Sequence, residues 1–144
     1  MKLSRRDCSL LLLPALLARA QAPKVSPLPS KTYRFEDLPV RTNGPNFSRK
    51  VLDGTLHDGF AIEVHATQLA PGSTSHPPHR HVHEEVIMLR EGTLEVFLNG
   101  NRTQLGPGGI MFFASNDEHG VRNVGSTPAH YAVVELRNKM ASGS

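Results

Sequence analysis

The chain has 144 residues, enough for one domain with a single hydrophobic core. Its 16 Lys and Arg residues outnumber its 13 Asp and Glu residues, a balance found in proteins that bind nucleic acid or anionic membranes. The excess lies in residues 1–20, which hold four basic residues and one acidic residue. The remainder has twelve of each and no net charge, so we exclude nucleic acid as a partner.

Residues 1–20 have the pattern of a secretory signal peptide. A basic start precedes an apolar stretch over 10–17, and Ala18-Arg19-Ala20 matches a cleavage site. We expect cleavage after Ala20 and a periplasmic or secreted mature protein. Ser4-Arg5-Arg6 resembles a twin-arginine export signal. The apolar stretch is shorter than the roughly 20 residues of a membrane helix, so no stable membrane span is expected.

Residues 21–36 follow as an extended linker or N-terminal arm, with three prolines before residue 30 and little to bury. From there on the sequence favours short strands and no helix. Asn99-Gly100 is a strong hairpin signal, and Gly and Pro mark the other corners. Over residues 37–140 this pattern predicts a small all-β sandwich or barrel. The expected strands are 60–69, 85–90, 93–98, 102–105, 110–113, 121–124 and 130–136.

The segment 76–85 reads HPPHRHVHEE, with four of the chain's eight histidines. In a strand, alternate residues share a face, so His79 and His81 would lie side by side. Glu85 comes four residues after His81, which leaves room for a short turn. His119, after a loop that follows an apolar strand, is the candidate for a fourth ligand. The only cysteine, Cys8, lies in the signal, so a metal in the mature protein would be held by His, Asp or Glu.

Two sets of spacings in this sequence resemble the two motifs of the cupin family. Pro71-Gly72, His79-x-His81-x3-Glu85 and Gly92 are similar to the first motif, and Gly108 with His119-x3-Asn123 is similar to the second. The resemblance covers about residues 60–136. It departs in two places: one extra residue precedes His79, and Ala114 and Asn116 replace a usual proline and glycine.

The resemblance implies a double-stranded β-helix, or jelly-roll cupin barrel, of the RmlC-like type. It also implies that His79, His81, Glu85 and His119 bind a divalent transition metal, which could be Mn, Fe, Ni or Zn. Such a ligand set leaves coordination positions open for a substrate. The arm at 21–36 would pair with a neighbouring barrel, so we expect a homodimer.

The other polar residues of the segment have weaker assignments. We expect His76 and His83 to face solvent or line the mouth of the barrel, and they are the candidates for an active-site base. Glu84 should point away from Glu85, and Asn123 could serve either the site or the fold. The expected pocket walls are Ile87, Leu89, and Phe113 or Val121. His57, His65 and His130 lack ligand spacing and are expected to be ordinary strand or surface histidines.

Two functions remain open at this point. The first is an exported metal-dependent enzyme that acts on a small organic substrate by dioxygenase, isomerase, decarboxylase or lyase chemistry. The second is a non-catalytic module that binds a small molecule or sugar. A storage role is a weaker third possibility, because the ligand residues are all retained.

Overall fold

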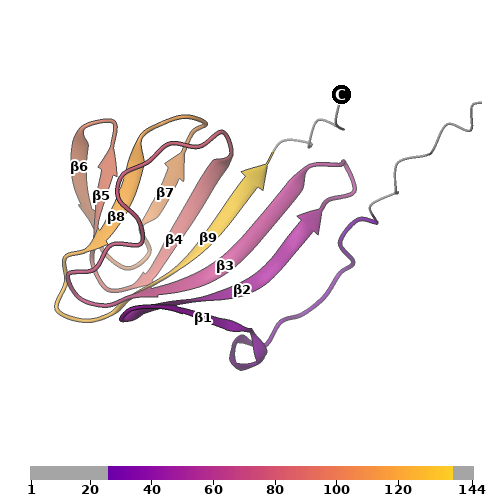
Figure 1. The fold of residues 1–144 in the computed structure, drawn as a ribbon, viewed down its shortest axis with the longest axis horizontal. Helices are drawn as coiled ribbons and strands as arrows, with labels where there is room; N and C mark the ends of the chain where they lie inside the picture. Colours follow the sequence, from indigo (N-terminus) through magenta and orange to yellow (C-terminus); the bar gives the residue numbers. More distant parts are fainter. Residues whose placement is uncertain (1–25, 138–144) are drawn as a thin grey trace, which may run out of the picture.

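The computed structural model describes residues 26–137. This part of the chain folds into two antiparallel sheets with no α-helix, and a single 3-10 turn over Phe35–Asp37 precedes the first strand (Figure 1). The predicted all-β jelly roll is confirmed. The strands are β1 Val40–Asn43, β2 Asn46–Thr55, β3 Ala61–Leu69, β4 Glu84–Glu91, β5 Leu94–Leu98, β6 Asn101–Leu105, β7 Ile110–Phe113, β8 His119–Asn123 and β9 Ala129–Arg137.

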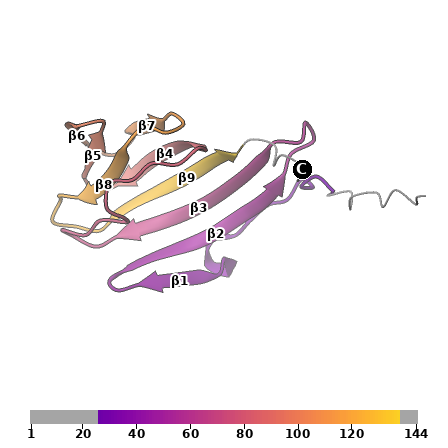
Figure 2. The same ribbon diagram turned by 45° about the horizontal axis from the view of Figure 1, so that its top comes forward.

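The two sheets differ in size, and this difference shapes the molecule. The large sheet has the strand order β1-β2-β3-β9-β4-β7, and the small sheet has the order β6-β5-β8. The small sheet faces the β4, β7 and β9 end of the large one, and β1 and β2 extend well beyond it (Figures 1 and 2). The inner face of the large sheet is therefore partly uncovered.

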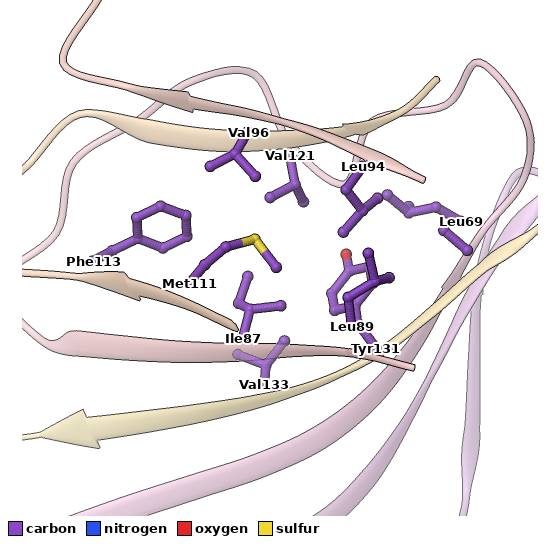
Figure 3. Packing of buried hydrophobic residues seen from close by; sticks show 11 residues of the cluster. Leu69, Ile87, Leu89, Leu94, Val96, Met111, Phe113, Val121, Tyr131 and Val133 are labelled. Atoms are coloured by element: carbon purple, nitrogen blue, oxygen red, sulfur yellow. The ribbon is translucent and has the colours of Figure 1, made fainter. Parts of the chain in front are cut away.

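The hydrophobic core fills the space between the small sheet and the facing strands of the large one. Along β4, Ile87 and Leu89 are buried and Met88 between them is exposed, as the alternation of side chains in a strand requires. Figure 3 shows side chains from the two sheets pointing toward each other. The buried apolar residues are Leu69, Ile87, Leu89, Leu94, Val96, Met111, Phe113, Val121, Ala129, Tyr131 and Val133.

The expected strands after residue 60 all form, with ends shifted by no more than two residues. Asn99 and Gly100 have φ values of +46° and +87°, the left-handed conformation that a tight hairpin turn needs. The hairpin of β1 and β2 was not among the expected strands. A bulge between Lys50 and Leu52 breaks the alternation of β2, which removed the period-2 signal.

Part of the predicted N-terminal arm packs against its own barrel. The Leu28 N–H donates to the Thr55 carbonyl at 2.8 Å, and the Leu28 side chain covers Gly54, where a Cβ would lie only 2.7 Å away. The predicted signal peptide lies outside the described residues. In residues 26–137 no helix is long and apolar enough to cross a membrane.

Candidate metal centre

Three histidines converge between the two sheets. One ring nitrogen from each of His79, His81 and His119 lies within 4.8 Å of the others. His119 is the first residue of β8, while His79 and His81 lie in the extended segment before β4. The expectation that these two share a regular strand was wrong, because only His79 makes a β-bridge, to His119. Their rings are nevertheless neighbours, with centroids 5.2 Å apart.

The backbone fixes the orientation of all three imidazoles. His79 Nδ1 lies 3.1 Å from the Pro77 carbonyl, and His81 Nδ1 lies 2.9 Å from the carbonyl of His83. His119 Nδ1 lies 2.9 Å from the carbonyl of Asp117. A carbonyl only accepts, so each Nδ1 carries the hydrogen and each Nε2 keeps its lone pair for a metal.

Glu85 supplies the carboxylate of the cluster. Its Oε2 lies 3.2 Å from His119 Nε2 and 3.4 Å from His81 Nε2. Two ligand atoms that each lie about 2.1 Å from one ion and subtend a right angle are about 3 Å apart. The observed distances fit that arrangement. The four residues predicted from the sequence are therefore brought together, and their donor set suits a divalent transition metal.

The three histidines of the cluster differ in burial, and His119 is the most buried of them. The His119 imidazole is 3% exposed and stacks on the Phe113 ring, with centroids 4.3 Å apart and an angle of 15° between the rings. Burial lowers the pKa of His79, and the neighbouring histidines lower it further. A lowered pKa keeps this imidazole neutral near pH 7, which is the form that binds metal.

The neighbouring histidines surround the cluster without completing it. The His83 ring stacks on His81 at 3.5 Å between centroids, and its Nε2 lies 3.6 Å from Glu135 Oε2. The His76 ring centroid lies 5.4 Å from that of His79. Burial lowers the pKa of His83. Both residues line the cavity, as expected, and Glu84 is exposed on the opposite side of β4 from Glu85.

The cluster opens into a cavity of about 440 Å³ between the sheets. Ile87, Phe113 and Val121 form part of its wall, as expected. Leu89 was also expected there, but it packs in the core at the other end of β4. His65 and Thr67, both on β3, also line the cavity, and neither was predicted to do so from the sequence. The alternation of β3 would have predicted both residues if it had been known which face of that strand points inward.

The second motif shows how two asparagines serve the site and the fold. Asn116 has a φ of +65°, the left-handed region that asparagine tolerates better than most residues. Glycine also adopts this region without strain, and the Asn116 N–H donates to the His81 carbonyl at 2.8 Å. Asn123 is fully buried and donates to the carbonyls of Leu69 and Thr127. Its role is in the fold.

The comparison with protein families agrees with this geometry. The family model described as "Cupin domain" matches residues 65–135, which run from β3 to β9 and include all four candidate ligands. The chain carries a small cupin domain. The resemblance inferred from the two motifs is confirmed.

Three proteins illustrate what this cupin is similar to. It is 33% identical over 73 residues to L-ectoine synthase of Bordetella parapertussis, covering 50% of this chain and 54% of that protein. The chain thus spans about half the length of the curated relatives it matches. An RmlC-like cupin from Shewanella frigidimarina superposes with a TM-score of 0.62 at 18% identity, covering 78% of this chain and 95% of that one. The polyketide cyclase RemF of Streptomyces resistomycificus superposes with a TM-score of 0.63 at 21% sequence identity, covering 78% of this chain and 87% of that one.

Proposed function

We propose that this cupin is a metal-dependent enzyme acting on a small organic substrate. The observation that carries the proposal is the shared orientation of three imidazoles. Each Nδ1 donates to a backbone carbonyl, and each Nε2 points into a cluster that Glu85 completes. The named synthase and cyclase among the similar proteins also support an enzyme.

The chain's own residues have distinct parts in this proposal. His79, His81, Glu85 and His119 would hold the ion, which when bound supplies a Lewis acid or a binding position for O₂. Ile87, Phe113 and Val121 exclude water from one side of the cavity. His83 is placed to contact a substrate, because it lines the cavity and is held on its far edge by Glu135. The reaction would belong to the dioxygenase, isomerase, decarboxylase or lyase type.

Metal content of the natively matured protein tests the proposal directly. We expect near-stoichiometric Mn, Fe, Ni or Zn in protein purified without added metal, measured by inductively coupled plasma mass spectrometry. His79→Ala and His81→Ala should lose the metal, and the exposed His57→Ala is the matched control. Full metal content in the two site variants, with their fold intact, would refute the assignment.

Turnover distinguishes the enzyme from a binding module. Oxygen consumption and product formation should be followed with the Fe(II)- or Mn(II)-loaded protein across a panel of small acids, sugars and keto compounds. An enzyme gives product, and the signal disappears in His81→Ala. Saturable binding without product under every condition would favour the non-catalytic module.

We further propose that the mature cupin is an exported homodimer. Its large sheet carries exposed apolar side chains on the outer face of β4, β7 and β9, which a second copy would cover. These residues are Met88, Ile110, Phe112 and Leu136. Light scattering of the mature protein should give the mass of a dimer, and Phe112→Glu should give a monomer; a wild-type monomer contradicts the proposal.

Export by the twin-arginine route is tested in cells. Replacing Arg5 and Arg6 by lysine should retain the protein in the cytoplasm, because that route reads the arginine pair. Fractionation and immunoblotting of the wild type and the variant measure the outcome. Unchanged secretion of the variant excludes this route.

A further inference from the structure

The inner face of the large sheet carries two rows of polar side chains, one on each side of the cavity. The strand registers align Asp53, Glu63, Glu135 and Glu85 across β2, β3, β9 and β4. We call this set the carboxylate row. The registers also align Arg41, Ser48, Thr67 and Tyr131 across β1, β2, β3 and β9, and we call this set the hydroxyl row. All but Asp53 and Glu63 line the cavity.

The carboxylate row already has its counter-charges. Arg137 makes ion pairs with Glu63, with Glu135 at 2.7 Å and with Asp53 at 3.5 Å. The last member of the row, Glu85, faces His81 and His119. A ligand with a negative charge gains nothing on this side, because Arg137 and Lys50 are already paired with the carboxylates of the row.

The hydroxyl row differs in having a cation without a partner. Within residues 26–137, the Arg41 guanidinium makes no hydrogen bond or ion pair, and it is the single Lys or Arg that lines the cavity in that part of the chain. Lys50 and Arg137, the other cations of the inner face, are paired with Asp53. Ser48, the register partner of Arg41 on β2, has a hydroxyl group that can donate to an oxyanion. The hydroxyl groups of Thr67 and Ser75 line the same cavity farther along, beside Tyr131.

Position along the sheet separates Arg41 from the histidine cluster. Arg41 lies on β1 and Glu85 on β4, and four strand spacings of about 4.8 Å each separate these strands. A molecule that reaches both ends must therefore be elongated, although the curvature of the sheet and the long Arg41 side chain shorten the gap. The continuous cavity offers the space for it.

We propose that the substrate is an elongated organic acid whose carboxylate pairs with Arg41 while its other end lies at the histidine cluster. The guanidinium of Arg41 forms the paired hydrogen bonds that match a carboxylate. A phosphate carries up to two charges and is matched by several cations, whereas this cavity wall supplies one. The placement of the substrate's other end at the histidine cluster rests on the proposed metal-dependent function. The pairing of its carboxylate with Arg41 does not.

Binding of defined acids tests the Arg41 end. Calorimetry of the Mn(II)-loaded protein with succinate, glutarate, adipate, suberate and sebacate should find one chain length that binds best. Arg41→Gln should weaken that acid by about tenfold or more, as expected for a lost charge-assisted pair. Arg102→Gln, on the exposed β6, is the matched control. Unchanged affinity of that acid for Arg41→Gln would overturn the proposal.

Two further experiments test the role of Arg41 independently of the metal assignment. Mn(II) affinity, titrated alone, should be the same in the wild type and in Arg41→Gln. If the protein binds none of Mn(II), Fe(II), Ni(II) and Zn(II), the proposed function fails. Arg41 is then still tested by comparing octanoate with octanamide on metal-free protein, because the acid should bind better only when Arg41 is present. Tighter binding of octyl phosphate than of octanoate would overturn the choice of a carboxylate.

Discussion

His79 and His119 each donate their backbone N–H to the carbonyl of the other, at 3.0 Å in both directions. This pair of hydrogen bonds joins the loop before β4 to the first residue of β8, across forty positions of sequence. It also places their imidazoles 4.9 Å apart at the ring centroids. The two motifs thus meet through backbone hydrogen bonds, so the fold itself holds these two histidines together.

The left-handed conformation of Asn116 should control the stability of the loop that precedes His119. Asn116→Gly is expected to be neutral, because glycine adopts a φ of +65° without strain. Asn116→Val should cost about 1–2 kcal/mol of unfolding free energy. It should also weaken metal binding, because the Asn116 N–H holds the His81 carbonyl. Urea unfolding and a metal titration measure both; equal behaviour of the two variants would contradict this account.

Asn123 should matter for stability and not for metal binding. Asn123→Ala removes the amide that bonds the carbonyls of Leu69 and Thr127 and accepts from the Gly125 N–H, all in a buried setting. Leaving such groups unpaired costs about 1–3 kcal/mol each, so we expect a loss of roughly 3 kcal/mol in urea unfolding. Asn101→Ala, at an exposed position of β6, is the control. A large loss of metal affinity at full stability would instead place Asn123 in the site.

Tyr131 should make folding sensitive to alkaline pH. Burial raises the pKa of its phenol from 10.0 to about 12. The folded pKa lies above the unfolded one, so this contribution is complete below pH about 10 and is lost as pH rises toward 12. We expect roughly 2–3 kcal/mol of stability to disappear over that window.

Tyr131→Phe isolates this effect. Unfolding free energies measured between neutral pH and the alkaline limit should fall less steeply in Tyr131→Phe than in the wild type. Replacing Tyr33, the only other tyrosine, by phenylalanine lets ultraviolet absorbance follow the ionisation of Tyr131 alone. A midpoint near that of the unfolded chain would show that the phenol is not buried in solution.

The sequence predicted those parts of the site that local spacing controls. His79, His81 and Glu85 lie within seven residues, and backbone geometry keeps such residues close together. The Asn99-Gly100 turn was predictable for the same reason, because its conformation depends on two adjacent residues. His119 was predicted from the resemblance to a motif, and the structure brings it to the cluster.

The tertiary structure decided what each face of a strand does. In β3, alternation was visible in the sequence, but the structure turns the polar residues His65 and Thr67 toward the cavity. Ile62 and Val64 lie on the other face of that strand, in register with Leu136 and Val134.

The sequence also did not predict which carbonyls accept from the imidazoles, or that Arg41 lines the cavity. The sequence by itself determined the strands after residue 60, their turns, and a cluster of ligand types at close spacing. Only the fold decided which side chains share a cavity, because register between distant strands depends on packing across the whole sheet.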